Sequence, residues 1–486
     1  MASGRDQLQS YQFLTQRVIS AFVMRETDPA QSPLRRGIGA VFGGLMVAVL
    51  VGAGFGVYGI LTKVGSNNWQ SDGSVVIEKE TGASFVYLGG KLHPTLNYAS
   101  ALLASGKAAA PSRVSRNALG TVPRGLTIGI AGAPNSLPAA NRIVSLPWTL
   151  CSSAGSDGSG GTATTVSLVA GSAPTGARGL TQEQGLLVRD STTGTNYLIW
   201  QRHRHQLREP RTVIPALFGA VVAPATAGTA WINAIPPGAA IGPITIDGRG
   251  TASRAVPNRK IGDQLFATTG SGPQYYLVFD DGIAPITELQ KAIVDAQFPA
   301  TPVQVSITDI NNTRSSNRLA TQPDESAAPK SPPKLDAQPA TPADLLCAVT
   351  TDPRGAPDIF SGGDVAGIGT GIPTSGRSPD GTSLADRIVI PAGRVAVIRV
   401  LVSPSALTGP YAIVTDLGVL FPVPSVQVLA VLGYPPDRAV DVPASLSSRI
   451  PTGPVLDPAA ALTPVSPNSG AGGVQSPSPT PSPSRS

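Results

Sequence analysis

Residues 37–61 read GIGAVFGGLMVAVLVGAGFGVYGIL and contain no charged side chain. A helix of this length spans the ~30 Å hydrocarbon core of a bilayer, even when it is tilted. The alternative, a buried helix of a soluble protein, would need apolar surroundings on every side of the helix. The run therefore predicts one transmembrane helix over residues 37–61.

Positive charge is unequal on the two sides of this run. The arginines Arg17, Arg25, Arg35 and Arg36 lie before it, whereas only the lysines Lys63 and Lys79 lie close behind it. The positive-inside rule then places residues 1–36 in the cytoplasm and the chain after residue 61 outside. A cleaved signal peptide fits less well, because a long polar segment precedes the run and the run exceeds a normal h-region. We expect a retained single-pass anchor in the cell membrane.

The cytoplasmic arm, residues 1–36, carries an apolar stripe at helical spacing, formed by Leu8, Tyr11, Leu14, Val18 and Phe22. Steps of three and four residues place these side chains on one face of a helix. The face could lie on the membrane surface, dock against another subunit, or fold against the chain's own anchor.

Composition limits the class of protein. The chain has 486 residues, 54 of them Gly and 47 Pro, and a formal net charge of +6. Several packed units with many turns are expected at this length. The small charge excess predicts no nucleic-acid partner. The two cysteines, Cys151 and Cys347, are too far apart for a zinc or redox motif; outside the cytosol a long-range disulfide is expected, with two free buried thiols as the alternative.

A repeated unit follows the anchor. Short apolar strands contain Tyr87-Leu88, Tyr197-Leu198, Tyr276-Leu277 and Tyr411-Ala412-Ile413. A Pro-x-Gly sequence follows the first, second and fourth of these strands. It begins at Pro123, Pro236 and Pro451, which lie 36, 39 and 40 residues after the tyrosine. The third copy lacks this signature but has the hairpin turn Asp280-Asp281-Gly282. Each copy is interpreted as a hairpin, a short helix and a closing strand.

Unequal spacing of the copies indicates insertions after the first and the third. Both insertions contain β-rich runs, residues 164–169 and 387–400, which could assemble into one separate β domain. The predicted outer repeats are residues 62–140, 191–250, 251–321 and 406–460, and the two parts of the central β domain are residues 141–190 and 344–405. A Pro-rich linker is predicted over residues 322–343 and a disordered Pro/Ser tail over residues 461–486.

Several stretches resemble the EccB family of type VII, or ESX, secretion systems. They are Tyr11-Gln12-Phe13-Leu14 with Arg17 and Asp28-Pro29, the run 82–88, Leu92-His93-Pro94, Pro123-Arg124-Gly125, Trp148-Thr149-Leu150-Cys151, the run 272–276, Leu346-Cys347 and the run 451–456. The resemblance covers nearly the whole chain. It implies an α+β fold, in which a single N-terminal transmembrane helix precedes an elongated extracytoplasmic domain of small α+β repeats around a central β domain. It also implies a disulfide between Cys151 and Cys347.

The resemblance further implies a function. Such a chain would be a structural core subunit of the secretion membrane complex, assembled with the C, D and E components and self-associating outside the membrane to stabilise the conduit. Family members have at times been labelled ATPases, so an ATP-hydrolysing component is one alternative. A cell-wall-binding ectodomain, suggested by the Pro/Ser tail, is another.

The sequence gives little support for an active site. Gly90-Lys91 and Gly106-Lys107 lack the upstream Gly and the following Ser or Thr of a phosphate-binding loop. The three histidines are His93, His203 and His205, and none has a recognisable catalytic partner. His93 is expected to pack or turn before Pro94, and His203 and His205 to lie on an exposed polar strand. We expect no catalytic residue, no metal ligand and no cofactor.

Overall fold

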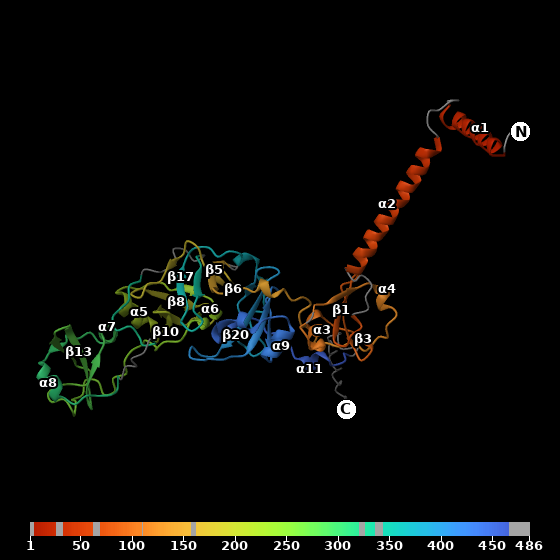
Figure 1. Cartoon of the computed structure of the whole chain (residues 1–486). Helices are drawn as coiled ribbons and strands as arrows, with labels where there is room; N and C mark the ends of the chain where they lie inside the picture. Colours follow the sequence, from red (N-terminus) through yellow and green to blue (C-terminus); the bar gives the residue numbers. More distant parts are fainter. Residues whose placement is uncertain are drawn as a thin grey trace, which may run out of the picture. The chain divides into compact units, whose positions relative to one another are not determined.

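The computed structural model describes residues 4–25, 33–61, 69–108, 110–156, 162–319, 326–335 and 344–465 (Figure 1). The chain divides into two compact units, Met1–Gln70 and Ser71–Ser486. Among the described residues, the first unit holds two helices and the second holds all the strands. Most of the predicted linker and the tail after residue 465 lie outside the described residues.

The first unit contains the apolar helix. Helix α2 runs over Pro33–Leu61, and its segment Gly37–Gly59 is long and apolar enough to cross a bilayer, with no residue of it buried. Large side chains such as Phe42 and Leu50 are about two-thirds exposed. A soluble protein rarely exposes so continuous an apolar surface. Helix α1, Gly4–Met24, carries the predicted stripe, and all five of its side chains are more than half exposed.

The second unit contains four repeats with one topology. In each, a first strand pairs antiparallel with a second and parallel with a fourth, the third strand lies outside the second, and a helix joins the third to the fourth. Repeat 1 comprises β1 (Ser74–Glu78), β2 (Ser84–Leu88), β3 (Lys91–Pro94), α3 (Tyr98–Ser105) and β4 (Ser112–Val114). Repeat 2 comprises β8 (Gly185–Asp190), β9 (Asn196–Trp200), β10 (His203–Gln206), α5 (Pro210–Phe218) and β11 (Ala225–Ala227).

The other two repeats have the same order of elements. Repeat 3 comprises β12 (Gln264–Thr269), β13 (Gly272–Phe279), β14 (Gly282–Ile286), α7 (Glu288–Gln297) and β15 (Val303–Gln304). Repeat 4 comprises β20 (Val395–Leu401), β21 (Tyr411–Thr415), β22 (Leu420–Val423), α9 (Val426–Val431) and β23 (Val440–Pro443). The unit is therefore a three-stranded meander, a helix and a closing parallel strand, one strand longer than the hairpin unit expected from the sequence.

Local chemistry explains where the helices begin and end. Asn97 caps α3 by accepting a hydrogen bond from the Ser100 amide, and Gly106 ends the helix in the left-handed conformation. Thr287 and Gln290 form a capping box at the start of α7. Such side chains satisfy backbone groups that a short helix cannot pair internally.

Strand register identifies the equivalent residues of the four repeats. In each repeat, one residue of the first strand pairs with the first residue of the fourth strand. The residue of the second strand that lies opposite it is Phe85, Tyr197, Tyr276 and Ala412 in repeats 1 to 4. Tyr87 and Tyr411 therefore do not occupy the position of the other two tyrosines, although their strands are equivalent. Counted from the equivalent residues, Pro123, Pro236 and Pro451 follow at 38, 39 and 39 positions, closer agreement than the tyrosine offsets gave.

The Pro-x-Gly segments pair with the third strand rather than with the first. Leu92, Arg204 and Leu420 each bridge in parallel to the middle residue of the segment, donating a hydrogen bond to the proline carbonyl and accepting one from the glycine amide. Repeat 3 makes the same backbone pattern without the signature, because Ile283 pairs with residues 314–316. The signature thus marks an extra edge segment of the sheet, one that all four repeats possess.

The central sheet has seven strands in the order β18-β19-β6-β5-β16-β17-β7. Their bounds are β5 Trp148–Ser156, β6 Thr162–Ala170, β7 Arg178–Gly179, β16 Leu346–Thr350, β17 Asp358–Ser361, β18 Ile372–Pro373 and β19 Arg387–Val389. The sheet combines both insertions. Two strands that the sequence analysis gave to the central domain, β8 and β20, pair instead within repeats 2 and 4. The β-rich run 387–400 is divided between two sheets by a turn from Pro391 to Arg394.

The buried cores join the repeats in an order that differs from the chain order. One core combines the central sheet with repeats 2 and 4. A second combines repeat 4 with repeat 1, and a third combines repeat 2 with α7 of repeat 3. The strands β8 and β20 are therefore covered on both faces, which explains why GLLVRD and VAVIRVL read as near-continuous apolar runs instead of alternating ones.

Candidate functional site

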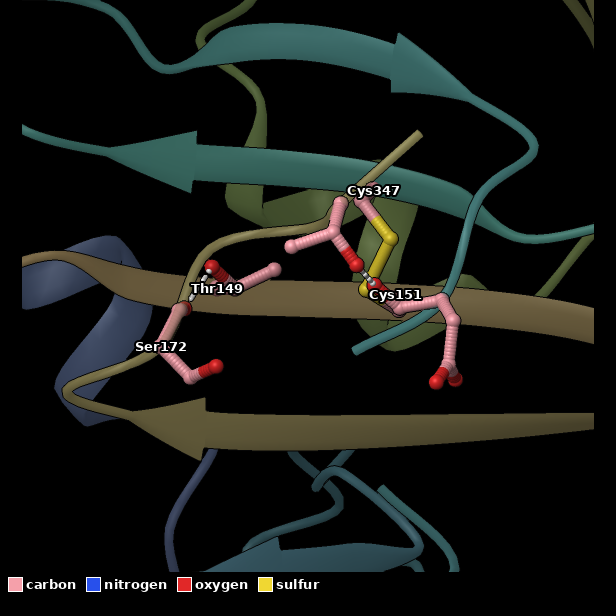
Figure 2. The surroundings of a disulfide bond; sticks show 6 residues. Thr149, Cys151, Ser172 and Cys347 are labelled. Carbon is pink, nitrogen blue, oxygen red and sulfur yellow. Dashed lines mark hydrogen bonds between the residues drawn. A yellow bond between two sulfur atoms is a disulfide. The ribbon is translucent and has the colours of Figure 1, made fainter. Parts of the chain in front are cut away.

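The only two cysteines form a disulfide across the middle of the central sheet. Cys151 on β5 lies directly opposite Cys347 on β16, with their Cα atoms 4.0 Å apart (Figure 2). Beside it on β5, the Thr149 hydroxyl donates a 2.6 Å hydrogen bond to the Ser172 carbonyl. The pairing expected from the cysteines and from the family resemblance is confirmed, and the alternative of free thiols is wrong.

The disulfide is shielded from solvent on its face of the sheet. Both cysteines are almost completely buried in a small apolar cluster with Val169, Val349 and Val389. On the opposite face, the alternate residues of the same strands enter the core shared with repeats 2 and 4. Neighbouring residues of a strand point to opposite faces of the sheet. The strand register that places the two cysteines opposite each other therefore also determines which residues enter this core.

The disulfide closes a very long loop. Its cysteines are 196 residues apart, and the intervening chain carries the whole of repeats 2 and 3. In the chain-entropy account, closing such a loop restricts the unfolded chain by about 5 kcal/mol. The disulfide thus links the two parts of the central sheet that precede and follow repeats 2 and 3 in the sequence.

Specific polar contacts attach the repeats to their neighbours. The Gly228 amide of repeat 2 donates a 2.9 Å hydrogen bond to the Ser152 hydroxyl on β5. The Tyr434 hydroxyl, after α9 of repeat 4, donates a 2.7 Å bond to the Pro138 carbonyl, and burial raises the pKa of this phenol. These bonds pair buried polar groups that the packing of the repeats removes from water.

Two histidines on the third strands of repeats 1 and 2, His93 and His205, contact the Pro-x-Gly edge segments. The Nδ1 atom of His93 lies 3.0 Å from the Leu126 carbonyl, and that of His205 lies 2.8 Å from the Ala239 carbonyl. Each acceptor directly follows the glycine of a Pro-x-Gly. The expected packing role of His93 agrees with this contact. The expected exposed strand is wrong for His205, which is fully buried. Burial lowers the pKa of His205, since desolvation disfavours the imidazolium.

The glycines of the signature make room for these rings. A Cβ on Gly125 would lie 2.3 Å from Cε1 of His93, and one on Gly238 would lie 2.3 Å from Cε1 of His205. In repeat 4 a Cβ on Gly453 would lie 2.5 Å from Cε1 of Phe421. Strand register places Ala284 and Ser316 at the corresponding positions of repeat 3. In repeat 3 the third strand carries the small Ala284 in place of a ring, so the edge segment has room for the side chain of Ser316. This explains why repeat 3 lacks the glycine.

Both Gly-Lys pairs lie in ordinary turns. Gly90-Lys91 closes the exposed turn from β2 to β3, and Gly106-Lys107 follows the C-terminus of α3. A phosphate-binding loop instead leads from a strand into the N-terminus of a helix. Within the described ranges, no group of three or more His, Cys, Asp or Glu side chains is placed to hold a metal ion.

An exposed apolar helix followed by tandem four-stranded repeats around a disulfide-tied sheet defines a membrane-anchored repeat protein. The family described as "Type VII secretion system ESX-1, transport TM domain B" matches residues 2–466. The chain therefore belongs to this family, the EccB component of type VII secretion.

Individual relatives agree with this assignment. The chain is 28% identical over 487 residues to the ESX-3 secretion system ATPase EccB3 of Mycolicibacterium smegmatis, covering 94% of this chain and 90% of that one. It is 31% identical over 311 residues to EccB3 of Mycobacterium tuberculosis, covering 60% of this chain and 56% of that one.

Solved structures show the same fold. A chain of an intact ESX-5 inner membrane complex superposes with a TM-score of 0.61 at 23% identity, covering 100% of this chain and 99% of that one. The EccB3 dimer from the ESX-3 core complex gives a TM-score of 0.59 at 26% identity, covering 80% of this chain and 100% of that one.

Proposed function

We propose that this chain is a structural subunit of a type VII secretion membrane complex, and that its outer part self-associates to stabilise the secretion conduit. The observation that carries the proposal is the family match over residues 2–466, which includes the anchor and all four repeats. Structurally similar chains are described as parts of an ESX-5 inner membrane complex, of its periplasmic assembly, and of an EccB3 dimer.

The architecture of the outer part suits a structural scaffold. Repeats 1 and 4, the central sheet and repeats 2 and 3 share successive buried cores, so adjacent parts cannot separate without exposing apolar side chains. The disulfide adds a covalent tie within this series. We infer that residues 1–36 lie in the cytoplasm and the repeats outside, as the arginines before the apolar run 37–61 favour, and that the C, D and E components are the partners.

Co-purification tests the proposal. An affinity tag on the full-length chain, extracted from its own cells in a mild detergent, should recover the C, D and E components in a particle larger than one copy of this chain. The same tag on an unrelated single-pass protein serves as the control. A monodisperse monomer without those components would count against a scaffold role.

The names of the curated relatives include the word ATPase. The positions of the Gly-Lys pairs give no support to such an activity in this chain, because neither pair precedes a helix. The scaffold proposal therefore does not depend on nucleotide hydrolysis.

A further inference from the structure

Two adjoining hollows lie where repeat 2 meets the central sheet. One has a volume of about 440 Å³ and is lined by residues 180–182, Arg202 and Asp358, among others. The other has about 650 Å³ and lies between Trp200 and residues 327–334. Gln182 and Gln201 line both hollows. These volumes lie in the usual range for small-ligand sites.

The hairpin turn between the two hollows has a strained backbone. Gln201 and Arg202 join β9 to β10 with φ angles of 45° and 64°, in the left-handed region. The equivalent turn of repeat 1 has glycine at both places, Gly89 and Gly90, with φ angles of 55° and 76°. Glycine adopts this conformation without steric cost, whereas glutamine and arginine do not. Strain of this kind is often found where a side chain has a task in binding.

The arginine has a structural explanation and the glutamine does not. Arg202 forms a 2.6 Å ion pair with Asp358 on β17, which holds the turn against the central sheet. Among the described residues, the side-chain amides of Gln201 and Gln182 make no hydrogen bond with the protein, and both side chains are exposed. Two free amides thus face the same pair of hollows.

The chemistry of the lining matches hydroxyl groups. An amide side chain both donates and accepts hydrogen bonds, as a hydroxyl does. Four of the five charged residues of the lining form ion pairs, Arg202 with Asp358 and Glu183 with Lys334, so that Lys330 alone adds a net charge. Trp200 contributes an indole that combines an apolar ring with a polar edge. We propose that the two hollows form one binding site for a neutral oligosaccharide, with Gln182 and Gln201 as its hydrogen-bonding residues.

Calorimetric titration of the full-length chain in detergent micelles tests this site. The probes are two neutral sugars, hexa-N-acetylchitohexaose and a galactan hexasaccharide, which differ in the N-acetyl group. A Pro/Ser hexapeptide represents an extended polypeptide. We expect one of the sugars to bind with a Kd on the order of 1 mM or tighter, with little dependence on salt because most of the charges are paired. Binding of the peptide alone, or of no probe, would overturn the assignment.

Two variants separate a ligand site from a merely strained turn. Gln201→Gly should raise Tm by about 1–3 °C because the strain is relieved, and yet weaken sugar binding by about fivefold or more, since a hydrogen-bonding side chain is lost. Gln182→Ala should weaken binding similarly without raising Tm. Gln304→Ala, on an exposed strand of repeat 3, is the matched control. Unchanged affinity in Gln201→Gly would refute the proposal even if the turn is stabilised.

Discussion

Substituting Gly238 with serine tests the packing that joins the edge segment of repeat 2 to its third strand. A Cβ there would lie 2.3 Å from Cε1 and 2.6 Å from Nδ1 of His205, far inside van der Waals contact. The ring has little freedom to move, because His205 is fully buried and bonded to the Ala239 carbonyl. Overpacking of this kind costs about 1–3 kcal/mol, and we expect Gly238→Ser to lose that much stability.

A second substitution should recover part of the loss. His205→Ala alone removes a buried ring and should cost about 2–4 kcal/mol. The double variant copies the Ala284 and Ser316 pair of repeat 3, so the serine gains the space that the ring had filled. We expect the combined loss to be smaller than the sum of the single losses by about 1 kcal/mol or more, as contacting residues couple.

Urea unfolding of the full-length chain in detergent micelles measures these differences. Tryptophan fluorescence is a suitable signal, since the Trp200 ring centroid lies 6.0 Å from that of His205. Gly270→Ser is the control, because a Cβ at Gly270 would meet nothing within 4 Å. Strictly additive effects, or a Gly238→Ser loss no larger than that of the control, would refute the complementarity between ring and glycine.

Three further predictions follow from the disulfide, from His205 and from the Gly-Lys pairs. Replacing both Cys151 and Cys347 with serine should lower the free energy of unfolding by up to about 5 kcal/mol, measured by denaturation; a reducing agent should then destabilise the native chain but not the variant. The lowered pKa of His205 means that the unfolded chain binds a proton more readily than the folded one. The contribution of His205 to stability should therefore be complete above about pH 6.5 and decrease as the pH falls below that value. His205→Phe, which copies Phe421 of repeat 4, should reduce this pH dependence when Tm is measured across pH. An unchanged pH profile in this variant would show that other groups cause the dependence. The purified full-length chain should release no more phosphate from ATP than a boiled control, and turnover abolished by a single substitution in the chain would support the ATP-hydrolysing alternative instead.

Features carried by local patterns were predicted well from the sequence. The apolar run 37–61 lies within α2, the stripe of the arm lies on α1, and the Asp280-Asp281 turn joins β13 to β14. The short helix expected in each repeat corresponds to α3, α5, α7 or α9. Each depends on composition, spacing or turn chemistry within a short window of sequence.

Features that depend on distant partners were predicted less well. The runs GLLVRD and VAVIRVL look like buried central strands, but sequence gives no sign that one face of each is covered by a neighbouring repeat. The burial of His205 could not be read from its polar neighbours, because the glycine that makes room for it is 33 residues further along the chain. The disulfide was predictable because only two cysteines were present and the resemblance paired them.

The central claim is that this chain forms part of an oligomeric membrane assembly through its outer repeats. Negative-stain imaging of the detergent-purified particle, with a compact fusion domain at the C-terminus of the chain, tests it most directly. We predict particles with several copies of the fusion domain, all on the side of the detergent belt that carries the repeats. Particles with a single fusion domain and no further mass would contradict the account.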